Sequence, residues 1–148
     1  MPEKLLNDQV IDQVLEAFTN LQKPVVILFF GSRQNCDYCD DTHQLIEEVV
    51  ALDKRLSLNR YDIDADREVA LLYRIDKTPG IVIAAGNGDH IIDYGIQYSG
   101  IPSGHEFSTL IQDILLVSGR DSGLNPQSRE FLKKLEKPLH LQVFVTPT

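Results

Sequence analysis

Residues 25–39 read Val-Val-Ile-Leu-Phe-Phe-Gly-Ser-Arg-Gln-Asn-Cys-Asp-Tyr-Cys, an apolar run that leads through a short polar loop to two cysteines three positions apart. The run at 25–30 predicts a strand buried on both faces of a sheet, because no polar residue interrupts it. Residues 31–35 predict a loop, and Asn35 is a favourable N-cap for a helix that follows. The stretch therefore predicts a strand, a loop and a helix with Cys36 in its first turn.

The segments around this stretch predict the order helix, strand, helix, strand, helix, strand, strand, helix. The expected elements are a helix over 3–21, a strand over 56–63, a short helix over 64–74 capped by Asp64, a strand over 81–85, a turn over 86–89, an antiparallel strand over 91–98 with a bulge at Gly95, and a helix opened by a capping box at Ser103 and Glu106. A βαβ unit followed by a hairpin and a covering helix is the α/β thioredoxin fold. Here we expect an extra N-terminal helix, a mixed central sheet flanked by helices, and a C-terminal helix–strand extension.

The composition limits the classes of partner. The chain has 148 residues and a formal net charge of −8, with 14 scattered Lys and Arg residues. This length suits one domain with a real core. Scattered basic residues in an acidic protein argue against nucleic acid as a partner. With no apolar segment of membrane-spanning length and no secretion signal at the N-terminus, we expect no membrane partner and a cytoplasmic location.

The two cysteines predict redox chemistry. Residues i and i+3 at a helix start have Cβ atoms about 5–6 Å apart, which is close enough for a disulfide. The free N–H groups and the dipole of the first turn favour a thiolate, so Cys36 is the expected nucleophile and Cys39 the resolving cysteine. The carboxylate of Asp37 disfavours that thiolate, while Arg33 in the preceding loop offsets it.

Other interpretations of the cysteine pair stay open. Cys36 and Cys39 would be idle structural residues in a non-catalytic interaction or folding module. With His43 they would bind a metal that bridges two chains, because zinc takes four ligands and the chain offers no second pair. Our own prediction for the chain is no cofactor and no metal ion.

A Thr-Pro pair precedes the strand over 81–85. A cis proline here would abut the disulfide and expose backbone groups to an extended substrate, whereas the alternative is an ordinary proline that opens a strand. The predicted site residues are Cys36 and Cys39 as catalytic residues, with Asp37, Tyr38, Thr78 and Pro79 as substrate-binding residues.

The chain also contains an internal similarity. Leu21-Gln22-Lys23-Pro24 recurs as Leu135-Glu136-Lys137-Pro138, and each copy lies between an amphipathic helix and an apolar strand. We therefore expect a thioredoxin-fold redox domain over residues 1–122. Residues 123–148 are expected to be the helix and strand that start a second, truncated thioredoxin-like unit. The strand predicted over 139–145 has an uncovered apolar face, which favours a homodimer through this extension.

Several motifs carry a resemblance to a known family. They are Cys36-Asp37-Tyr38-Cys39, Tyr73-Arg74-Ile75-Asp76, Thr78-Pro79, the stretch Gly100-Ile101-Pro102-Ser103-Gly104-His105-Glu106-Phe107, and the closing Val143-Phe144-Val145-Thr146-Pro147-Thr148. Together they resemble the protein disulfide oxidoreductases of archaea and thermophilic bacteria, also called glutaredoxin-like proteins. The resemblance implies two tandem thioredoxin-fold units that act on protein disulfides and dithiols, with electrons from a thioredoxin-reductase-like flavoprotein.

Two positions depart from ordinary thioredoxins. Asn35 stands where a Trp usually precedes the nucleophile, and Phe30 stands where a buried Asp usually assists proton transfer from the second cysteine. We therefore expect the deprotonation of Cys39 to lack that base.

Overall fold

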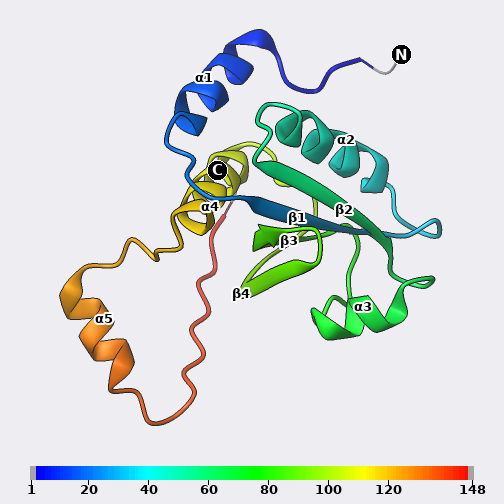
Figure 1. Ribbon diagram of the computed structural model, residues 1–148. Helices are drawn as coiled ribbons and strands as arrows, with labels where there is room; N and C mark the ends of the chain where they lie inside the picture. Colours follow the sequence, from blue (N-terminus) through cyan, green and yellow to red (C-terminus); the bar gives the residue numbers. More distant parts are fainter. Residues whose placement is uncertain (1–2, 147–148) are drawn as a thin grey trace.

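The computed structural model describes residues 3–146 of the chain. Its elements are α1 (Asp8–Phe18), β1 (Val25–Gly31), α2 (Cys39–Val50), β2 (Leu56–Asp62), α3 (Arg67–Leu72), β3 (Gly80–Asn87), β4 (His90–Ser99), α4 (His105–Gly119) and α5 (Pro126–Lys133). Their order confirms the predicted thioredoxin fold with an extra N-terminal helix (Figure 1). The first helix is shorter than expected, because Asn7 caps it by accepting a hydrogen bond from the Val10 N–H at 2.9 Å.

The sheet has the strand order β2-β1-β3-β4, and every residue of β1 is buried at its centre. β1 is parallel to β2 and antiparallel to β3, while β3 and β4 form an antiparallel hairpin. The predicted bulge is present, because the β3–β4 register shifts where Ile83 and Ala84 face Ile96 and Asp93, and Gly95 has a φ of 84°.

Two apolar layers explain the unbroken run of β1. Val25, Ile27 and Phe29 belong to the core formed with α1, α2 and α4 on one face of the sheet. The alternate residues of β1 face α3 in a smaller core on the other side, which also contains Ala70. Since both faces are covered, neither set of side chains needs to be polar.

The start of α2 differs from the prediction. Asn35 is not the N-cap: it has a φ of 53°, and Tyr38 occupies the N-cap position of a helix that begins at Cys39. The left-handed backbone at Asn35 turns the chain before the helix begins. Cys36 therefore lies in the turn ahead of α2, not in its first helical turn.

Two other predicted caps are also wrong. The N-cap position of α3 is Asp66, not Asp64. At the start of α4, Gly104 takes the N-cap position with a φ of 61°, and no side chain caps the helix. The predicted capping box does not form. The Glu106 N–H donates to the backbone carbonyl of Ser103 at 3.3 Å, and not to the Ser103 hydroxyl.

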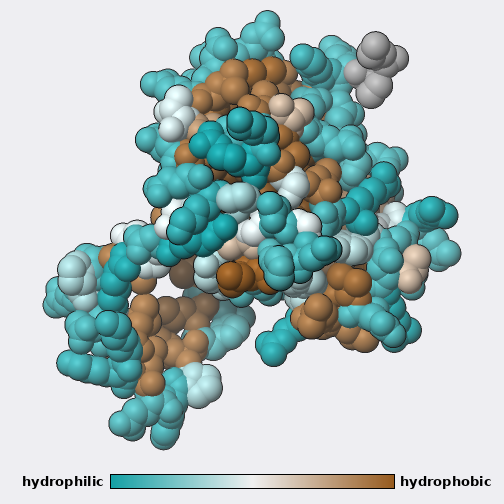
Figure 2. Space-filling model, in the orientation of Figure 1, coloured by the Kyte–Doolittle hydropathy of each residue, from teal (hydrophilic) through white to brown (hydrophobic). Residues whose placement is uncertain are grey.

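The described residues of the C-terminal extension, 123–146, include no buried residue. α5 has no buried residue, and in the described part of a single chain residues 139–145 pair with no strand. The strand expected over 139–145 is therefore absent from the monomer, and the side chains of Leu141 and Val143 are 81% and 85% exposed. Figure 1 shows α5 standing away from the sheet and the segment after it running back toward α4, and Figure 2 shows apolar atoms open to solvent beside α5.

Pro147 and Thr148, the last two residues of the closing family motif, lie outside the described residues. The division into a redox domain over residues 1–122 and a second unit over residues 123–148 stays a prediction. Among residues 3–146, no helix has the length and apolar character needed to cross a membrane.

Candidate active site

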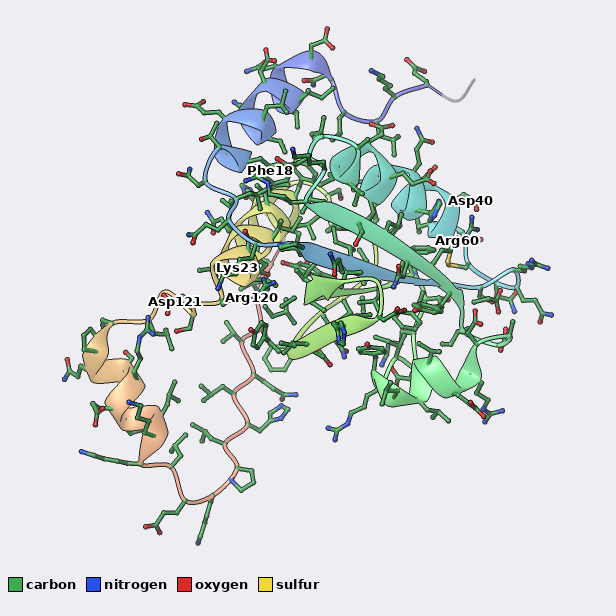
Figure 3. All side chains as sticks on the ribbon, in the orientation of Figure 1. Phe18, Lys23, Asp40, Arg60, Arg120 and Asp121 are labelled. Atoms are coloured by element: carbon green, nitrogen blue, oxygen red, sulfur yellow. A yellow bond between two sulfur atoms is a disulfide. The ribbon has the colours of Figure 1, made fainter. Side chains whose placement is uncertain are left out.

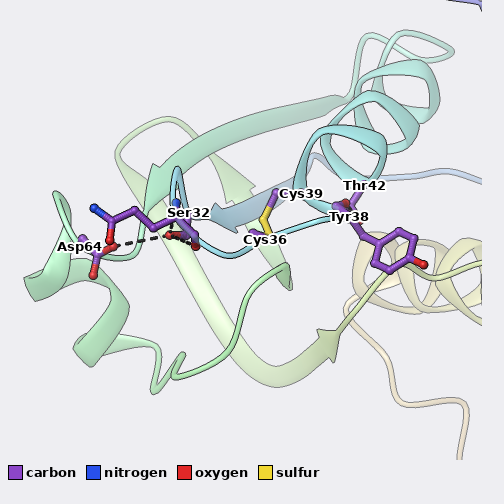
Figure 4. The surroundings of a disulfide bond; sticks show 7 residues. Ser32, Cys36, Tyr38, Cys39, Thr42 and Asp64 are labelled. Atoms are coloured by element: carbon purple, nitrogen blue, oxygen red, sulfur yellow. Dashed lines mark hydrogen bonds between the residues drawn. A yellow bond between two sulfur atoms is a disulfide. The ribbon is translucent and has the colours of Figure 1, made fainter.

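The cysteine pair lies at the carboxyl end of β1, where the chain leaves the central strand for α2 (Figure 4). Cys36 and Cys39 form a disulfide with their Cα atoms 5.5 Å apart, within the usual range. Cys36 is partly exposed, whereas Cys39 is 6% exposed and belongs to the main core. The two sulfur atoms therefore differ in their access to solvent.

Hydrogen bonds hold the turn on both sides of the cysteines. The Ser32 hydroxyl donates to the Gln34 carbonyl at 2.9 Å and accepts from the Gln34 N–H at 3.0 Å. On the helix side, the hydroxyl of Thr42 donates to the Tyr38 carbonyl at 2.6 Å, and its backbone N–H donates to the same carbonyl at 2.9 Å. Thr42 is fully buried. The apolar pattern of this helix did not identify Thr42, because that pattern considers only the apolar residues. The signal was a Thr on the apolar side of a helix, since a buried hydroxyl needs a hydrogen-bond partner.

The predicted substrate-binding residues occupy the same end of the sheet as the disulfide. Asp37 is exposed, and Tyr38 is 60% exposed with its ring pointing away from the disulfide (Figure 4). The Thr78–Pro79 peptide bond is cis, as the prediction allowed. It directly precedes Gly80, which pairs with Phe30 at the carboxyl end of β1. The fold thus brings all four residues to one end of the sheet.

A polar cavity of about 700 Å³ opens beside both cysteines. Its charged lining residues are Arg33, Asp40, Arg60, Asp62 and Asp66. Arg60, Asp62 and Asp66 come from β2 and the turn before α3, and the sequence pattern did not place them at the site. Strand alternation could have assigned Arg60 to a face of the sheet. Only the pairing of β2 with β1 shows that this face borders the cysteines.

Two of the ionisable groups near the cavity have shifted pKa values. The N–H groups of Ala65 and Asp64 donate to the Asp62 carboxylate at 3.1 and 2.9 Å, and they lower the pKa of Asp62. Burial lowers the pKa of His43, whose Nδ1 lies 3.6 Å from Glu47 Oε2.

The alternative metal site, formed by Cys36, Cys39 and His43, is not assembled among the described residues. The imidazole of His43 packs edge-on against Phe29, with ring centroids 5.1 Å apart. Among the described residues, no group of three or more His, Cys, Asp or Glu side chains could hold a metal ion. The alternative therefore depends on ligands from a second chain.

Phe30 is completely buried, and its ring stacks on Tyr61 with centroids 5.2 Å apart. The position that carries an assisting Asp in ordinary thioredoxins is thus part of an apolar cluster.

The chain is similar to known redox proteins in sequence, although no protein family model matches it. An alkyl hydroperoxide reductase of Staphylococcus aureus is 28% identical over 120 residues, which is 81% of this chain and 20% of that protein. The chain thus spans about a fifth of the length of this curated relative.

Two solved structures are similar over most of the chain. The alkylhydroperoxide reductase AhpF of Enterococcus faecalis superimposes with a TM-score of 0.78 and 26% identity, covering 89% of this chain and 62% of that one. A protein disulfide oxidoreductase from Aeropyrum pernix gives a TM-score of 0.73 and 25% identity, covering 87% and 55%. The fold is like that of thiol–disulfide oxidoreductases, and the Cys-x-x-Cys pair lies at disulfide distance. The chain therefore resembles the thioredoxin-like proteins, and the solved structures similar to it include a protein disulfide oxidoreductase, as the sequence motifs predicted.

Proposed function

We propose that this chain catalyses thiol–disulfide exchange on protein substrates through Cys36 and Cys39. The observation that carries the proposal is the asymmetry of the pair: Cys36 is partly exposed, and Cys39 is buried beneath it at disulfide distance. In the reducing direction, the Cys36 thiolate attacks a substrate disulfide and one substrate sulfur leaves. Cys39 then attacks the Cys36 sulfur, which releases the second substrate sulfur and closes the Cys36–Cys39 bond.

The proposed substrate-binding surface surrounds the exposed sulfur. Tyr38 offers an exposed ring, and the Thr78–Pro79 segment starts β3 at the same end of the sheet. Asp37, exposed between the cysteines, adds a charge next to Cys36. These positions support contact with an extended protein segment carrying the disulfide or dithiol.

The proposed partners follow from the resemblance and from the extension. The likeness to protein disulfide oxidoreductases supports protein disulfides as substrates and a thioredoxin-reductase-like flavoprotein as the reductant, in the cytoplasm. The exposed apolar segment over 139–145 supports a second copy of the chain as a further partner.

Reduction of insulin disulfides tests the proposal, with electrons from dithiothreitol. We expect wild type to accelerate the reduction and Cys36→Ser to abolish the acceleration. A Cys39→Ser variant should form a mixed disulfide with the substrate that persists, because the resolving thiol is missing. If wild type and Cys36→Ser are equally slow, the chain is a non-catalytic interaction or folding module.

A further inference from the structure

Arg60 brings a positive charge to the cavity beside the disulfide. It pairs with Phe29 in the parallel β1–β2 register, so both side chains leave the sheet on the face that α2 covers. Arg60 lines the cavity of about 700 Å³ together with Cys36 and Cys39. Figure 3 shows Arg60 close to Asp40, next to the yellow bond of the disulfide.

Among the described residues, no ion pair or hydrogen bond engages the charge of Arg60. Three of the other arginines do make such contacts: Arg55 is bonded to Asp53, Arg129 to Asp121, and Arg120 to the Pro24 carbonyl. Within residues 3–146, the guanidinium of Arg60 has no hydrogen bond and no ion pair. A cation without a partner at the edge of a redox site is available to an anion that forms there.

The exchange reaction creates such an anion on Cys39. The sulfur of Cys39 belongs to a residue that is 6% exposed, and burial disfavours a charged thiolate. Phe30, fully buried on the opposite face of β1, offers no carboxylate to accept the proton. Another group must therefore lower the free energy of the Cys39 thiolate.

We propose that Arg60 is a positioning residue whose charge stabilises the Cys39 thiolate when the Cys36–Cys39 bond breaks or forms. This inference rests on the proposed function. When a substrate thiolate attacks the Cys36 sulfur, a new sulfur–sulfur bond forms, the old one breaks, and its electron pair leaves on Cys39. In the reverse step the Cys39 thiolate gives that pair to Cys36, and the substrate sulfur leaves with its own pair and takes a proton from water.

Other charged groups line the cavity beside Arg60, and Arg33 is the second cation among them. The carboxylate of Asp62 is held by two backbone N–H groups, and that of Asp66 accepts from the Asp62 N–H at 2.8 Å. Arg33 acts electrostatically on Asp62. Asp40 opposes Arg60 from the start of α2 and weakens its effect. The field of Arg60 reaches the helix, since it contributes to lowering the pKa of His43, one turn beyond Cys39.

Titration of Cys39 tests the proposal without any substrate. In a Cys36→Ala background, Cys39 is the single remaining thiol, and its ionisation is followed by thiolate absorbance against pH. We expect Arg60→Gln to move the midpoint upward by about half a pH unit, or about threefold less thiolate at a given pH, because the charge is partly screened by solvent. Arg60→Lys keeps the charge and should restore most of the change.

Arg67→Gln is the matched control. It removes the same charge from an exposed position on α3 that borders a different cavity, lined by Ile63, Leu71 and Ile75 and by neither cysteine. The proposal is overturned if Arg60→Gln titrates like its parent, or if Arg67→Gln produces an equal shift. The proposed function fails separately, on the insulin assay of the wild-type protein.

Discussion

The ring of Phe29 occupies the space that a side chain on Gly31 would need. A Cβ atom at Gly31 would lie 2.8 Å from Cε1 and 3.1 Å from Cζ of that ring, and 3.6 Å from the sulfur of Cys39. Phe29 is 1% exposed, so its ring has little room to retreat. The absence of a side chain at Gly31 therefore lets an aromatic ring and the buried sulfur pack at the point where β1 meets the cysteine loop.

We expect Gly31→Ala to destabilise the protein by about 1–3 kcal/mol, because the added methyl group overpacks this junction. Urea denaturation measures the difference. Gly119→Ala is the control: a Cβ there would meet only Gln22 Nε2 at 3.6 Å, an ordinary contact, and alanine is a better helix former than glycine. A Gly31→Ala variant as stable as Gly119→Ala would mean that the Phe29 ring moves aside freely.

The exposure difference within the cysteine pair predicts unequal reactivity. In the reduced protein, we expect iodoacetamide to modify Cys36 at least about tenfold faster than Cys39, because the partly exposed thiol is the accessible one. Peptide mass spectrometry after short reaction times identifies the labelled residue. Equal rates, or faster labelling of Cys39, would reverse the roles of the two cysteines.

Asp37 is expected to hold back the nucleophile. Its exposed carboxylate follows Cys36 directly, so Asp37→Asn should lower the pKa of the Cys36 thiol and make the disulfide more oxidising. Thiolate absorbance against pH and equilibration with glutathione measure the two effects. Asp41→Asn, on the exposed side of α2 and outside the sulfur-lined cavity, is the control. An unchanged Cys36 titration in Asp37→Asn would show that the carboxylate points away.

The sequence predicted what apolar periodicity and spacing determine. The run over 25–30 fixed the central strand, and the spacing of Cys36 and Cys39 fixed the disulfide. Caps were predicted less well, because residues such as Asn35 are equally suited to a helix cap and to a left-handed turn, and the local backbone decides between them.

The polar side of the site was missed for a different reason. Arg60 and Asp62 reach the disulfide through the pairing of β2 with β1, which is a contact between residues some 30 positions apart in sequence. Hydrophobic patterning assigns a residue to a face, but it does not say which loop that face meets. The cavity therefore became visible only in the folded chain.

The Asp53–Arg55 pair gives the fold a pH dependence. Arg55 Nη2 lies 2.6 Å from Asp53 Oδ2, and Arg55 Nη1 donates to the Leu21 carbonyl at 2.6 Å, which ties the residue before β2 to the loop between α1 and β1. The side-chain hydrogen bonds from Arg55 lower the pKa of Asp53 below 3.8. The stabilisation is therefore present at neutral pH and is lost as the pH falls below 3.8 through the pKa of the folded state.

Asp53→Asn should accordingly unfold at a lower urea concentration than wild type at neutral pH, with the gap closing as the pH falls below 3.8. Urea unfolding at several pH values measures the gap. Asp12→Asn, at an exposed position on α1, serves as control and should leave the midpoint unchanged. A gap that persists unchanged in acid would assign the loss to packing and not to the charge of Asp53.

The exposed segment after α5 predicts self-association. Leu141, Val143 and Val145 are 81–85% exposed and alternate along an extended chain, and β4 is an edge strand of the sheet. Beside β4 lies a cavity of about 410 Å³ lined by Tyr94, Ile96 and Leu116 among others, which offers an apolar surface for such side chains. A second copy can supply both an open strand edge and this surface to the segment, and the first copy can do the same in return.

We therefore expect the 148-residue chain to sediment as a dimer at tens of micromolar. Replacing Leu141 and Val143 together by Glu should shift it to monomers, because two charges would have to be buried in the contact. The matched control replaces His140 and Gln142 by Glu, which adds the same two negative residues to the other face of the extended segment and should leave the dimer in place. If wild type already sediments as a monomer, the segment has no second copy as its partner. Equal dissociation of both double variants would trace the effect to net charge instead of to the apolar face.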